Sequence, residues 1–595
     1  MKKYTVEELT KIFAEHPYIP QYYTEEDRQR ILNNPLAEPY LQNVREMYDK
    51  YTEKPIVALP FTSFKRYYKD GNRKEGEFWY FYNRSRLGTV ALMAWLYQKE
   101  EYYGEVENSL WAMMDEYVWN IPAHIGDTAL TELQEDSYII DLFSAETCSV
   151  IAEILSVLGD KLEPVITKRA ERMINERCFD VLDKPFWWKK STNNWSAVCA
   201  GHVGMTAICM KRDPAELAKI IHTCLDTMEY FLSGYPNDGA CTEGLGYWGY
   251  GFGNYTHFGY LLHERTEGAI NLFEDEKVRR IANFPRKCFF KDGRIITFSD
   301  CGGNPSRFDI ALTLTLNKFY PEITLPERER ISFHYGDGPA FGTSIRTLFW
   351  LPDSFEGKAL EYGTHILPDA QWYISSSDNG LGIAAKAGYN WERFESHNHN
   401  DIGGFIIYKN GRDLVADIGG GVYNSTYFDP AYRYDNFACS SAGHSVPMID
   451  GNTQKYGEKF RAKNTVITEE NGLTADISGA YDVENLESLV RNIRLDQATG
   501  KVYLKDTYKF KAAPTSVVER FISYIEPSIE NGVATITNDG ETLTFGYDKS
   551  VVKPVVRVFE DQNNQVRHRD GFKAYMLDFE VLNPSAEFTV EFTLE

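Results

Sequence analysis

The chain has 595 residues, of which 43% are hydrophobic and 14% aromatic, so it can bury sizeable cores. Acidic residues outnumber basic ones by 86 to 63, and the formal charge of −23 argues against nucleic acid as the main partner. No signal peptide is visible, and no apolar run approaches the length of about 18 residues that a membrane span needs. We therefore predict a cytoplasmic protein with no membrane partner, whose nine scattered cysteines are reduced thiols.

Paired helical patterns fill the chain from about residue 25 to 340. Segments such as GTVALMAWLYQKEEYYGEVENSLWAMMDEYVW contain two stretches of helical apolar spacing around a short polar break. Each segment predicts a helical hairpin, which is too thin to bury its apolar faces alone and must stack on the next. The hairpins predict an α/α toroid or solenoid domain over residues 1–350.

A polar helix start stands out in this half, in the stretch WWKKSTNNWSAVCAGHVG. Ser191, Thr192, Asn193 and Asn194 precede an apolar helix, so we expect one of these four to be its N-cap. A cap needs only one such residue, however, and here two amides lie beside Trp195 and Lys190. The stretch therefore indicates an anion-facing surface, where amide NH2 groups could bind a substrate carboxylate.

Glycines and aromatic residues alternate in a second stretch, GYPNDGACTEGLGYWGYGFGNYTHFGY. This density predicts an irregular, ring-lined loop that leads into a helix. Tyr247, Trp248 and Tyr250 could line a sugar-binding cleft, although aromatic packing is the alternative interpretation. Glu243 could be a helix-start acid or a hydrogen-bond support for a tyrosine.

Between residues 345 and 370 the pattern changes to alternating strands such as QWYISSS, KVYLKDTYKF and AEFTVEFTLE. Strands at this spacing predict an antiparallel β-sandwich domain over residues 351–595. The chain is therefore predicted to be an α+β multidomain protein.

Histidines gather early in this β half, in the stretch FESHNHNDIGGFIIYKNGRDLVADIGGG. If the segment is extended, His397, His399 and Asp401 point to one face. The Asn-Gly turn that follows predicts a hairpin whose returning strand brings Asp417 back beside the histidines. A further histidine, His444, follows in AGHSVPMIDG. Two imidazoles and a carboxylate are a common ligand set for zinc.

Three motifs in this order resemble the heparinase II/III-like polysaccharide lyases. They are the Asn-Asn-Trp helix start, the E-G-x-G-Y-W-x-Y stretch and the H-x-H-x-D-x-G-x-F hairpin, which is followed by D-x-G and G-H. The resemblance covers most of the chain. It implies an incomplete α/α toroid followed by an antiparallel β-sandwich. It also implies β-elimination at a uronic acid of an acidic oligosaccharide or polysaccharide, with glycosaminoglycans of the heparan, chondroitin or hyaluronan type ahead of alginate.

The resemblance also implies roles for individual residues. Tyr247 matches the tyrosine that carries protons, with Tyr250 as its rival, and His397 matches a catalytic histidine that acts as a base or as a carboxylate partner. Asn193 and Asn194 would neutralise the uronate carboxylate. Asn194 stands where some relatives have histidine, which shifts weight to Tyr247. The residues expected to contact the sugar are Lys190, Trp195, Glu243, Trp248, Tyr250 and Arg393.

The ligands implied for a structural zinc ion are His399, Asp417 and His444, with Asp401 orienting a histidine and no organic cofactor. Two other functions stay open. A glycoside hydrolase would need a pair of carboxylates, for which Glu243 and Asp238 are the candidates. A non-catalytic carbohydrate-binding protein would need no proton carrier at all. A homo-oligomer is also possible.

Overall fold

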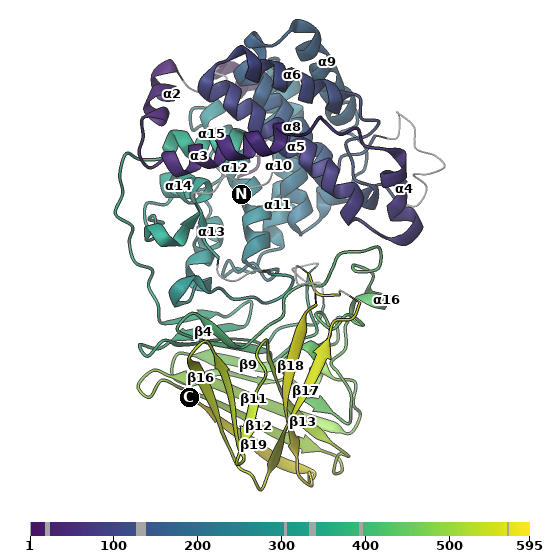
Figure 1. Ribbon diagram of the computed structural model, residues 1–595, viewed down its shortest axis with the longest axis vertical. Helices are drawn as coiled ribbons and strands as arrows, with labels where there is room; N and C mark the ends of the chain where they lie inside the picture. The colour runs from purple at the N-terminus through teal and green to yellow at the C-terminus, as the bar shows by residue number, and fades with distance from the viewer. Residues whose placement is uncertain are drawn as a thin grey trace. The chain divides into compact units, whose positions relative to one another are not determined.

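The computed structural model describes residues 2–17, 24–126, 138–302, 306–332, 341–391, 397–563, 565–567 and 571–595. The chain forms two compact units (Figure 1). Unit 1 comprises residues 1–234, 249–279 and 307–359, and unit 2 comprises residues 235–248, 280–306 and 360–595. Two short segments from the helical half of the sequence therefore belong to unit 2.

Unit 1 is helical, as the apolar spacing predicted. Several of its helices begin at side-chain caps, such as the capping box in which Asp141 and Ser144 exchange hydrogen bonds at the start of α8. Helix α10 packs against both α8 and α11, and it is buried on nearly all sides. The helices up to the β half are α1 (Val6–Glu15), α2 (Glu25–Leu32), α3 (Glu38–Thr52), α4 (Phe61–Asp70), α5 (Lys74–Tyr97), α6 (Glu100–Met114), α8 (Leu142–Leu158), α9 (Pro164–Ile174), α10 (Asn194–Met210), α11 (Pro214–Ser233), α12 (Leu245–Arg265), α13 (Glu276–Cys288), α14 (Ile310–Phe319) and α15 (Phe341–Trp350).

One described helical segment, Leu142–Lys161, is long and apolar enough to cross a membrane by length and composition. Within the fold, 67% of its most apolar window is buried, which fits a core helix of the toroid.

Helix α12 corrects the loop expected around Tyr247, because the helix already begins at Leu245. The glycines that indicated a loop allow close packing instead. A Cβ atom on Gly251 would lie 3.2 Å from the Cβ of Asn194, and one on Gly201 would lie 3.1 Å from the carbonyl oxygen of Asn254. Glycine in a helix interior costs about 1 kcal/mol, and here the close approach of α10 and α12 offsets that cost.

Unit 2 is built from antiparallel sheets, as predicted. An eight-stranded sheet has the order β14-β15-β16-β19-β12-β11-β10-β9, a four-stranded sheet has the order β17-β18-β13-β8, and a five-stranded sheet has the order β3-β4-β5-β6-β7. The strands are β3 (Thr364–Leu367), β4 (Trp372–Ser376), β5 (Leu381–Lys386), β6 (Phe405–Lys409), β7 (Arg412–Val415), β8 (Met448–Ile449), β9 (Lys463–Thr468), β10 (Gly472–Asp476), β11 (Leu486–Asp496), β12 (Lys501–Phe510), β13 (Val517–Ser523), β14 (Ser528–Glu530), β15 (Val533–Asn538), β16 (Glu541–Tyr547), β17 (Val552–Glu560), β18 (Lys573–Val581) and β19 (Glu587–Leu594). A short parallel pair, β1 (Phe308–Asp309) and β2 (Ile331–Ser332), lies in unit 1.

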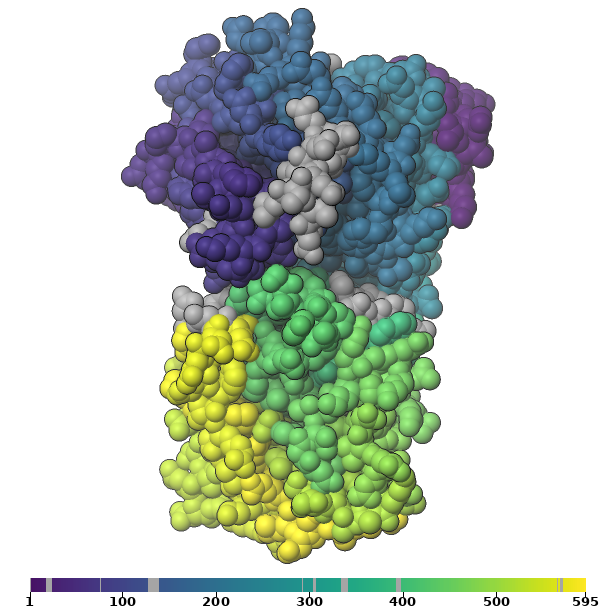
Figure 2. Space-filling view, turned by 90° about the vertical axis from the view of Figure 1, so that its right-hand side faces the viewer, coloured from purple at the N-terminus to yellow at the C-terminus, as the bar shows by residue number. Residues whose placement is uncertain are grey.

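The sandwich core follows the alternation in the strands. Buried and exposed residues alternate along β12, so one face of this sheet packs inward. The rings of Phe521, Phe545, Phe579 and Phe592 pack together in that core. The chain near residue 566 pairs with the chain near residue 421, and Figure 2 shows the yellow C-terminal part of unit 2 beside its green segment.

The predicted hairpin after the histidines is confirmed. Strands β6 and β7 pair, and Asn410 and Gly411 between them have φ angles of +43° and +75°, as a type I′ turn requires. The H-x-H segment is not part of a strand, because β6 begins only at Phe405, so the condition under which His397, His399 and Asp401 would share one face of a strand is not met. All nine cysteines are free and buried, as the prediction of reduced thiols requires.

Candidate functional site

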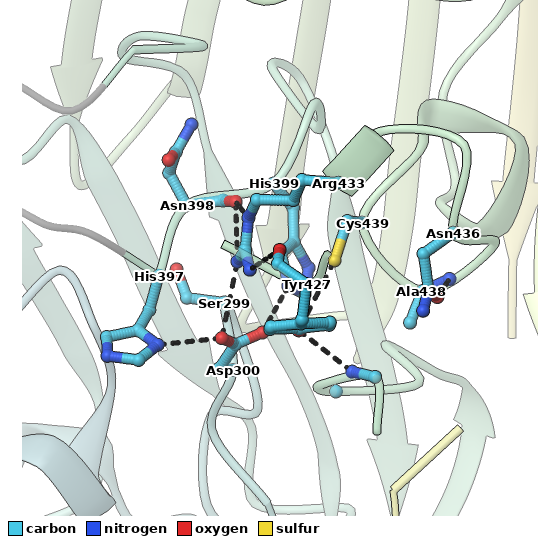
Figure 3. A network of polar contacts seen from close by, with 12 residues as sticks. Ser299, Asp300, His397, Asn398, His399, Tyr427, Arg433, Asn436, Ala438 and Cys439 are labelled. Carbon is cyan, nitrogen blue, oxygen red and sulfur yellow. Dashed lines mark hydrogen bonds and ion pairs between the residues drawn. The ribbon is translucent and has the colours of Figure 1, made fainter. Parts of the chain in front are cut away.

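Asp300 is the centre of a buried polar network in unit 2 (Figure 3). Its Oδ2 accepts hydrogen bonds from His397 Nδ1 at 2.7 Å and Arg433 Nη2 at 3.2 Å, and its Oδ1 accepts one from His399 Nε2 at 2.9 Å. The Tyr427 hydroxyl also donates to Oδ1. Burial would raise the pKa of Asp300, but Arg433 and the two histidines hold it well below its usual range. Asp300 is therefore a carboxylate that fixes both histidines of H-x-H.

The backbone beside Asp300 is strained. Ser299 is fully buried and has a φ angle of +62°, which a residue with a side chain adopts at a cost of order 1 to 3 kcal/mol. Its hydroxyl donates to the carbonyl oxygen of Thr242 at 2.8 Å. Thr242 lies just before α12, so this bond ties the Asp300 loop to the chain that leads into Tyr247.

Tyr247 stacks on His397, with ring centroids 3.9 Å apart and planes at 21°. Its hydroxyl shares a short hydrogen bond with that of Tyr423, which also lies 3.3 Å from Asp300 Oδ2 and from His397 Nδ1. Burial and the charge of Asp300 raise the pKa of Tyr247 above its ordinary value. Its phenol therefore stays protonated at neutral pH. The rival Tyr250 belongs to the part of α12 that lies in unit 1.

A group of side chains that could hold a metal ion includes His399. Ligand atoms of His399, Asp401 and His444 lie within 4.8 Å of one another, and Asp417 Oδ2 lies 3.4 Å from His444 Nδ1. His399 Nδ1 is buried without a hydrogen-bond partner, and such an orphaned lone pair fits a metal ligand. His444 Nε2 faces the Ala438 carbonyl oxygen at 3.0 Å, which orients the ring. Of the predicted ligands, His399 and His444 thus belong to a group that could hold a metal ion, whose third member is Asp401, and Asp417 lies beside His444.

The role expected for Asp401 is corrected. Its carboxylate pairs with Lys386 Nζ at 2.8 Å, and the carboxylate that bonds to both His397 and His399 is Asp300. Asp300, His399 and Cys439 form a second group that could hold a metal ion, since their ligand atoms lie within 4.8 Å of one another.

The predicted asparagines lie at the start of α10 in unit 1. Asn193 is the N-cap, as expected for one of the four polar residues 191–194, and its Oδ1 accepts the Trp195 N–H at 3.1 Å. Asn194 is buried in the first turn. The Trp195 ring meets the edge of the His124 ring at 4.7 Å between centroids. His124 Nδ1 in turn lies 2.7 Å from the buried carboxylate of Asp141.

The remaining predicted sugar contacts are dispersed. Lys190 is exposed at the end of a short 3-10 helix before α10. Glu243 and Trp248 are buried in unit 2, where the Trp248 indole donates to the Ile281 carbonyl oxygen at 2.8 Å. Arg393 lies outside the described residues.

Sequence reasoning missed Asp300, Tyr423, Tyr427 and Arg433. One signal for Asp300 was present: it follows the apolar run IITF and precedes Cys-Gly-Gly, a setting typical of a tight backbone turn. The other three lie in the stretch after D-x-G, where tyrosines and arginines are too common to mark a site.

Residues 362–509 match the model of the heparinase II/III-like C-terminal domain family. The fold is similar to that of a heparan sulfate lyase HepC mutant from Pedobacter heparinus, with a TM-score of 0.58 at 13% identity over 98% of this chain and 92% of that one. It is also similar to a heparinase III, with a TM-score of 0.59 at 14% identity over 96% of this chain and 93% of that one. No protein with a curated description matches the chain in sequence.

The matched region contains the H-x-H histidines, Asp417 and His444. The match to the heparinase II/III-like C-terminal domain over residues 362–509 confirms the resemblance read from the motifs in that part of the chain. The solved structures have the same succession of an α/α toroid and an antiparallel β-sandwich.

Proposed function

We propose that the protein is a polysaccharide lyase that cleaves uronate-containing glycosaminoglycans by β-elimination. The observation that carries the proposal is the position of His397 between a buried carboxylate, Asp300, and a protonated phenol, Tyr247. Base, orienting carboxylate and acid are the groups that a proton abstraction followed by loss of an oxygen leaving group requires. Similar lyases share the fold, and the similarity supports the same class of reaction.

His397 suits the role of the base. Because Asp300 is ionised and accepts at Nδ1, the neutral ring carries its proton on Nδ1 and its lone pair on Nε2. The Nε2 lone pair would take the proton from carbon 5 of the uronate. Asp300 fixes the ring orientation and stabilises the imidazolium that forms, as the aspartate of a Ser-His-Asp triad does.

Tyr247 suits the role of the acid. Its raised pKa keeps the phenol protonated until the glycosidic oxygen at carbon 4 needs a proton. The electrons of the C5–H bond then form the C4–C5 double bond, the C4–O bond breaks, and the tyrosine proton goes to the leaving oxygen. No water is added to either fragment, so one fragment carries an unsaturated uronate at its new non-reducing end.

The uronate carboxylate must be neutralised before carbon 5 can lose its proton, and we assign this role to Asn193 and Asn194. Among the residues that the structure describes, the Asn193 side chain bonds through its oxygen alone, so its NH2 group is a donor for a ligand oxygen. An amide that binds the developing charge contributes about 2 to 4 kcal/mol to the lowering of the barrier.

We also propose that His399, Asp417 and His444 hold a structural zinc ion. A bound zinc ion would supply rigidity to the chain that carries His397, just before the β6–β7 hairpin.

Ultraviolet absorbance during incubation with heparan, chondroitin, hyaluronan and alginate oligosaccharides tests the proposal, with mass spectrometry of the products. Absorbance of a conjugated alkene and fragments without added water are expected from a glycosaminoglycan. The same products from alginate alone would make the protein an alginate lyase. Fragments that carry added water would overturn β-elimination.

The contacts of Asp238 weigh against the hydrolase alternative. Its Oδ1 accepts the Ala240 N–H at 3.0 Å, and its Oδ2 accepts those of Asp369 and Ala370 at 2.8 and 2.9 Å. A carboxylate held by three backbone groups supports a loop and is poorly placed to activate water. The pair that a hydrolase would need, Glu243 with Asp238, is therefore not favoured.

A further inference from the structure

The described residues of the loop after β17, 561–563 and 565–567, are held against the chain that carries Tyr423. The Asp561 carboxylate accepts the N–H groups of Gln565 and Val566 at 2.7 Å each, which closes the loop on itself. Backbone bonds then join it to the segment after β7: the Val422 N–H donates to the Gln565 carbonyl oxygen at 2.6 Å. The position of this loop therefore rests on main-chain bonds, which substitutions of exposed side chains leave in place.

Arg567 is the residue that this loop presents to the site. Its N–H donates to the Gly420 carbonyl oxygen at 3.0 Å, and its guanidinium lies over the Tyr423 ring, 4.5 Å from the centroid. The hydroxyls of Tyr423 and Tyr247 are hydrogen-bonded to each other. The Arg567 guanidinium therefore lies beside this tyrosine pair of the candidate site. Arg567 is nevertheless exposed, and a ligand in solution can reach it.

Among the described residues, the other cations close to this network are already paired. Arg433 is 2% exposed, and its guanidinium binds Asp300 and the Asn398 carbonyl oxygen. Lys386 is paired with the carboxylate of Asp401. Arg567, in contrast, makes no ion pair with a carboxylate among the residues that the structure describes, and Tyr423, Tyr247 and Asp300 raise its pKa although burial lowers it. Arg567 therefore carries a permanent positive charge and has N–H groups that can bind an anion.

We propose that Arg567 binds an anionic substituent of the sugar, a carboxylate or a sulfate ester, beside the Tyr247–Tyr423 pair. A planar guanidinium offers two parallel N–H donors to two oxygens of either group, which a lysine cannot do. Because Tyr423 supports one face of the guanidinium, its fork loses little freedom on binding. The assignment rests on the proposed lyase function, and it adds a specificity-determining residue from beyond the family match, which ends at residue 509.

Binding measured without turnover tests this assignment. Isothermal titration of the Tyr247→Phe variant uses two probes, an unsulfated heparosan tetrasaccharide and a sulfated heparin tetrasaccharide. Adding Arg567→Met should weaken binding about ten- to hundredfold, as expected for loss of a charge-assisted bidentate contact. Arg567→Lys should fall between the two, since it keeps the charge and loses the fork.

Lys573→Met is the matched control, because Lys573 is an exposed cation of the same hairpin that pairs with Glu560. It should leave the affinity unchanged. A loss on both probes assigns the carboxylate to Arg567, and a loss on the sulfated probe alone assigns a sulfate. Equal affinity of Arg567→Met and its parent for both probes would overturn the assignment, as would failure of the parent to bind either probe.

Two measurements distinguish this assignment from a purely structural role of Arg567 and from the lyase proposal. If Arg567 only packed on Tyr423, Arg567→Met would lower the melting temperature and leave the salt dependence of binding unchanged. We expect an unchanged melting temperature and a changed salt dependence. The lyase proposal is tested by wild-type product analysis on the whole panel. Binding that depends on Arg567, with no unsaturated product from any panel member, would contradict the lyase proposal and still support the anion site.

Discussion

The Asp300 carboxylate and the His397 ring are 97 positions apart in the chain and 2.7 Å apart in the fold. Replacing Asp300 with asparagine keeps the shape but presents an NH2 group where an acceptor is needed. By analogy with the Asp→Asn change in a serine-protease triad, turnover should fall about 10³- to 10⁴-fold. The initial rate of alkene formation, divided by the fraction of folded protein, measures this loss.

The same substitution leaves Arg433 buried without its carboxylate, at a cost of about 3 to 5 kcal/mol in the free energy of unfolding. Asp506→Asn provides the control, because it breaks an equally buried pair with Arg491 inside the sandwich. It should cost stability and spare turnover per folded molecule. Equal turnover losses in both variants would mean that Asp300 acts only through stability.

Tyr247→Phe removes the phenolic proton and retains the ring that stacks on His397. We expect turnover to fall about 10²- to 10⁴-fold, the range of general acid catalysis, with little change in melting temperature. Tyr250→Phe is the comparison variant and should retain most of its turnover. If the two variants exchanged these results, the proton would come from Tyr250.

Asn193→Ser separates the two functions of this residue. Serine caps a helix as well as asparagine does, so the free energy of unfolding should hold, whereas Asn193→Ala should lose about 1 kcal/mol. Both variants lack the amide NH2 group, so the barrier should rise by about 2 to 4 kcal/mol in each. Normal turnover of Asn193→Ser would reduce the residue to a helix cap.

His399→Gln should lower the metal content of the purified protein, because it removes the buried Nδ1 lone pair. At a free metal concentration of 100 times the dissociation constant, the lost binding accounts for about 2.7 kcal/mol of stability. Elemental analysis and thermal melting measure both effects, and a chelator should reproduce them in the wild type. His365→Gln, a half-buried histidine of β3, should keep the metal; an unchanged metal content in His399→Gln would rule out the ligand assignment.

Asp141 predicts an acid-sensitive term in the stability of unit 1. Burial opposes ionisation, but hydrogen bonds from His124 and Ser144 lower its pKa below the ordinary value. A lowered folded-state pKa stabilises the fold above the unfolded value of about 3.9, and this stabilisation is lost as the pH falls through the folded-state pKa.

Asp141→Asn should therefore be less stable than the wild type at neutral pH, and the difference should shrink below about pH 4. Urea unfolding at several pH values checks it. Asp213→Asn changes an exposed cap of α11 and should show a much smaller pH-dependent difference. A difference between wild type and Asp141→Asn that does not vary with pH would contradict the assignment.

The sequence allowed the β6–β7 hairpin and the histidine group to be predicted, because the Asn-Gly turn and the H-x-H spacing are local signals. Asp300 and Tyr423 could not be found in this way. They meet His397 only through long-range packing: the turn signal around Asp300 does not indicate its partners, and Tyr423 is not unusual in its own neighbourhood. The loop expected at Tyr247 failed for a related reason: glycine in α12 serves the close approach to Asn194, a tertiary contact that outweighs helix propensity.

The nine buried cysteines make the native chain a set of internal reporters. Five of them, Cys148, Cys178, Cys199, Cys209 and Cys224, lie in unit 1, and Cys241, Cys288, Cys301 and Cys439 lie in unit 2. A thiol reagent reaches a buried sulfur only when the surrounding structure opens, so labelling rates resolved by peptide mass spectrometry give the opening free energy of each unit without any engineered probe. The order in which the toroid and the sandwich come apart can thus be timed in the unmodified protein.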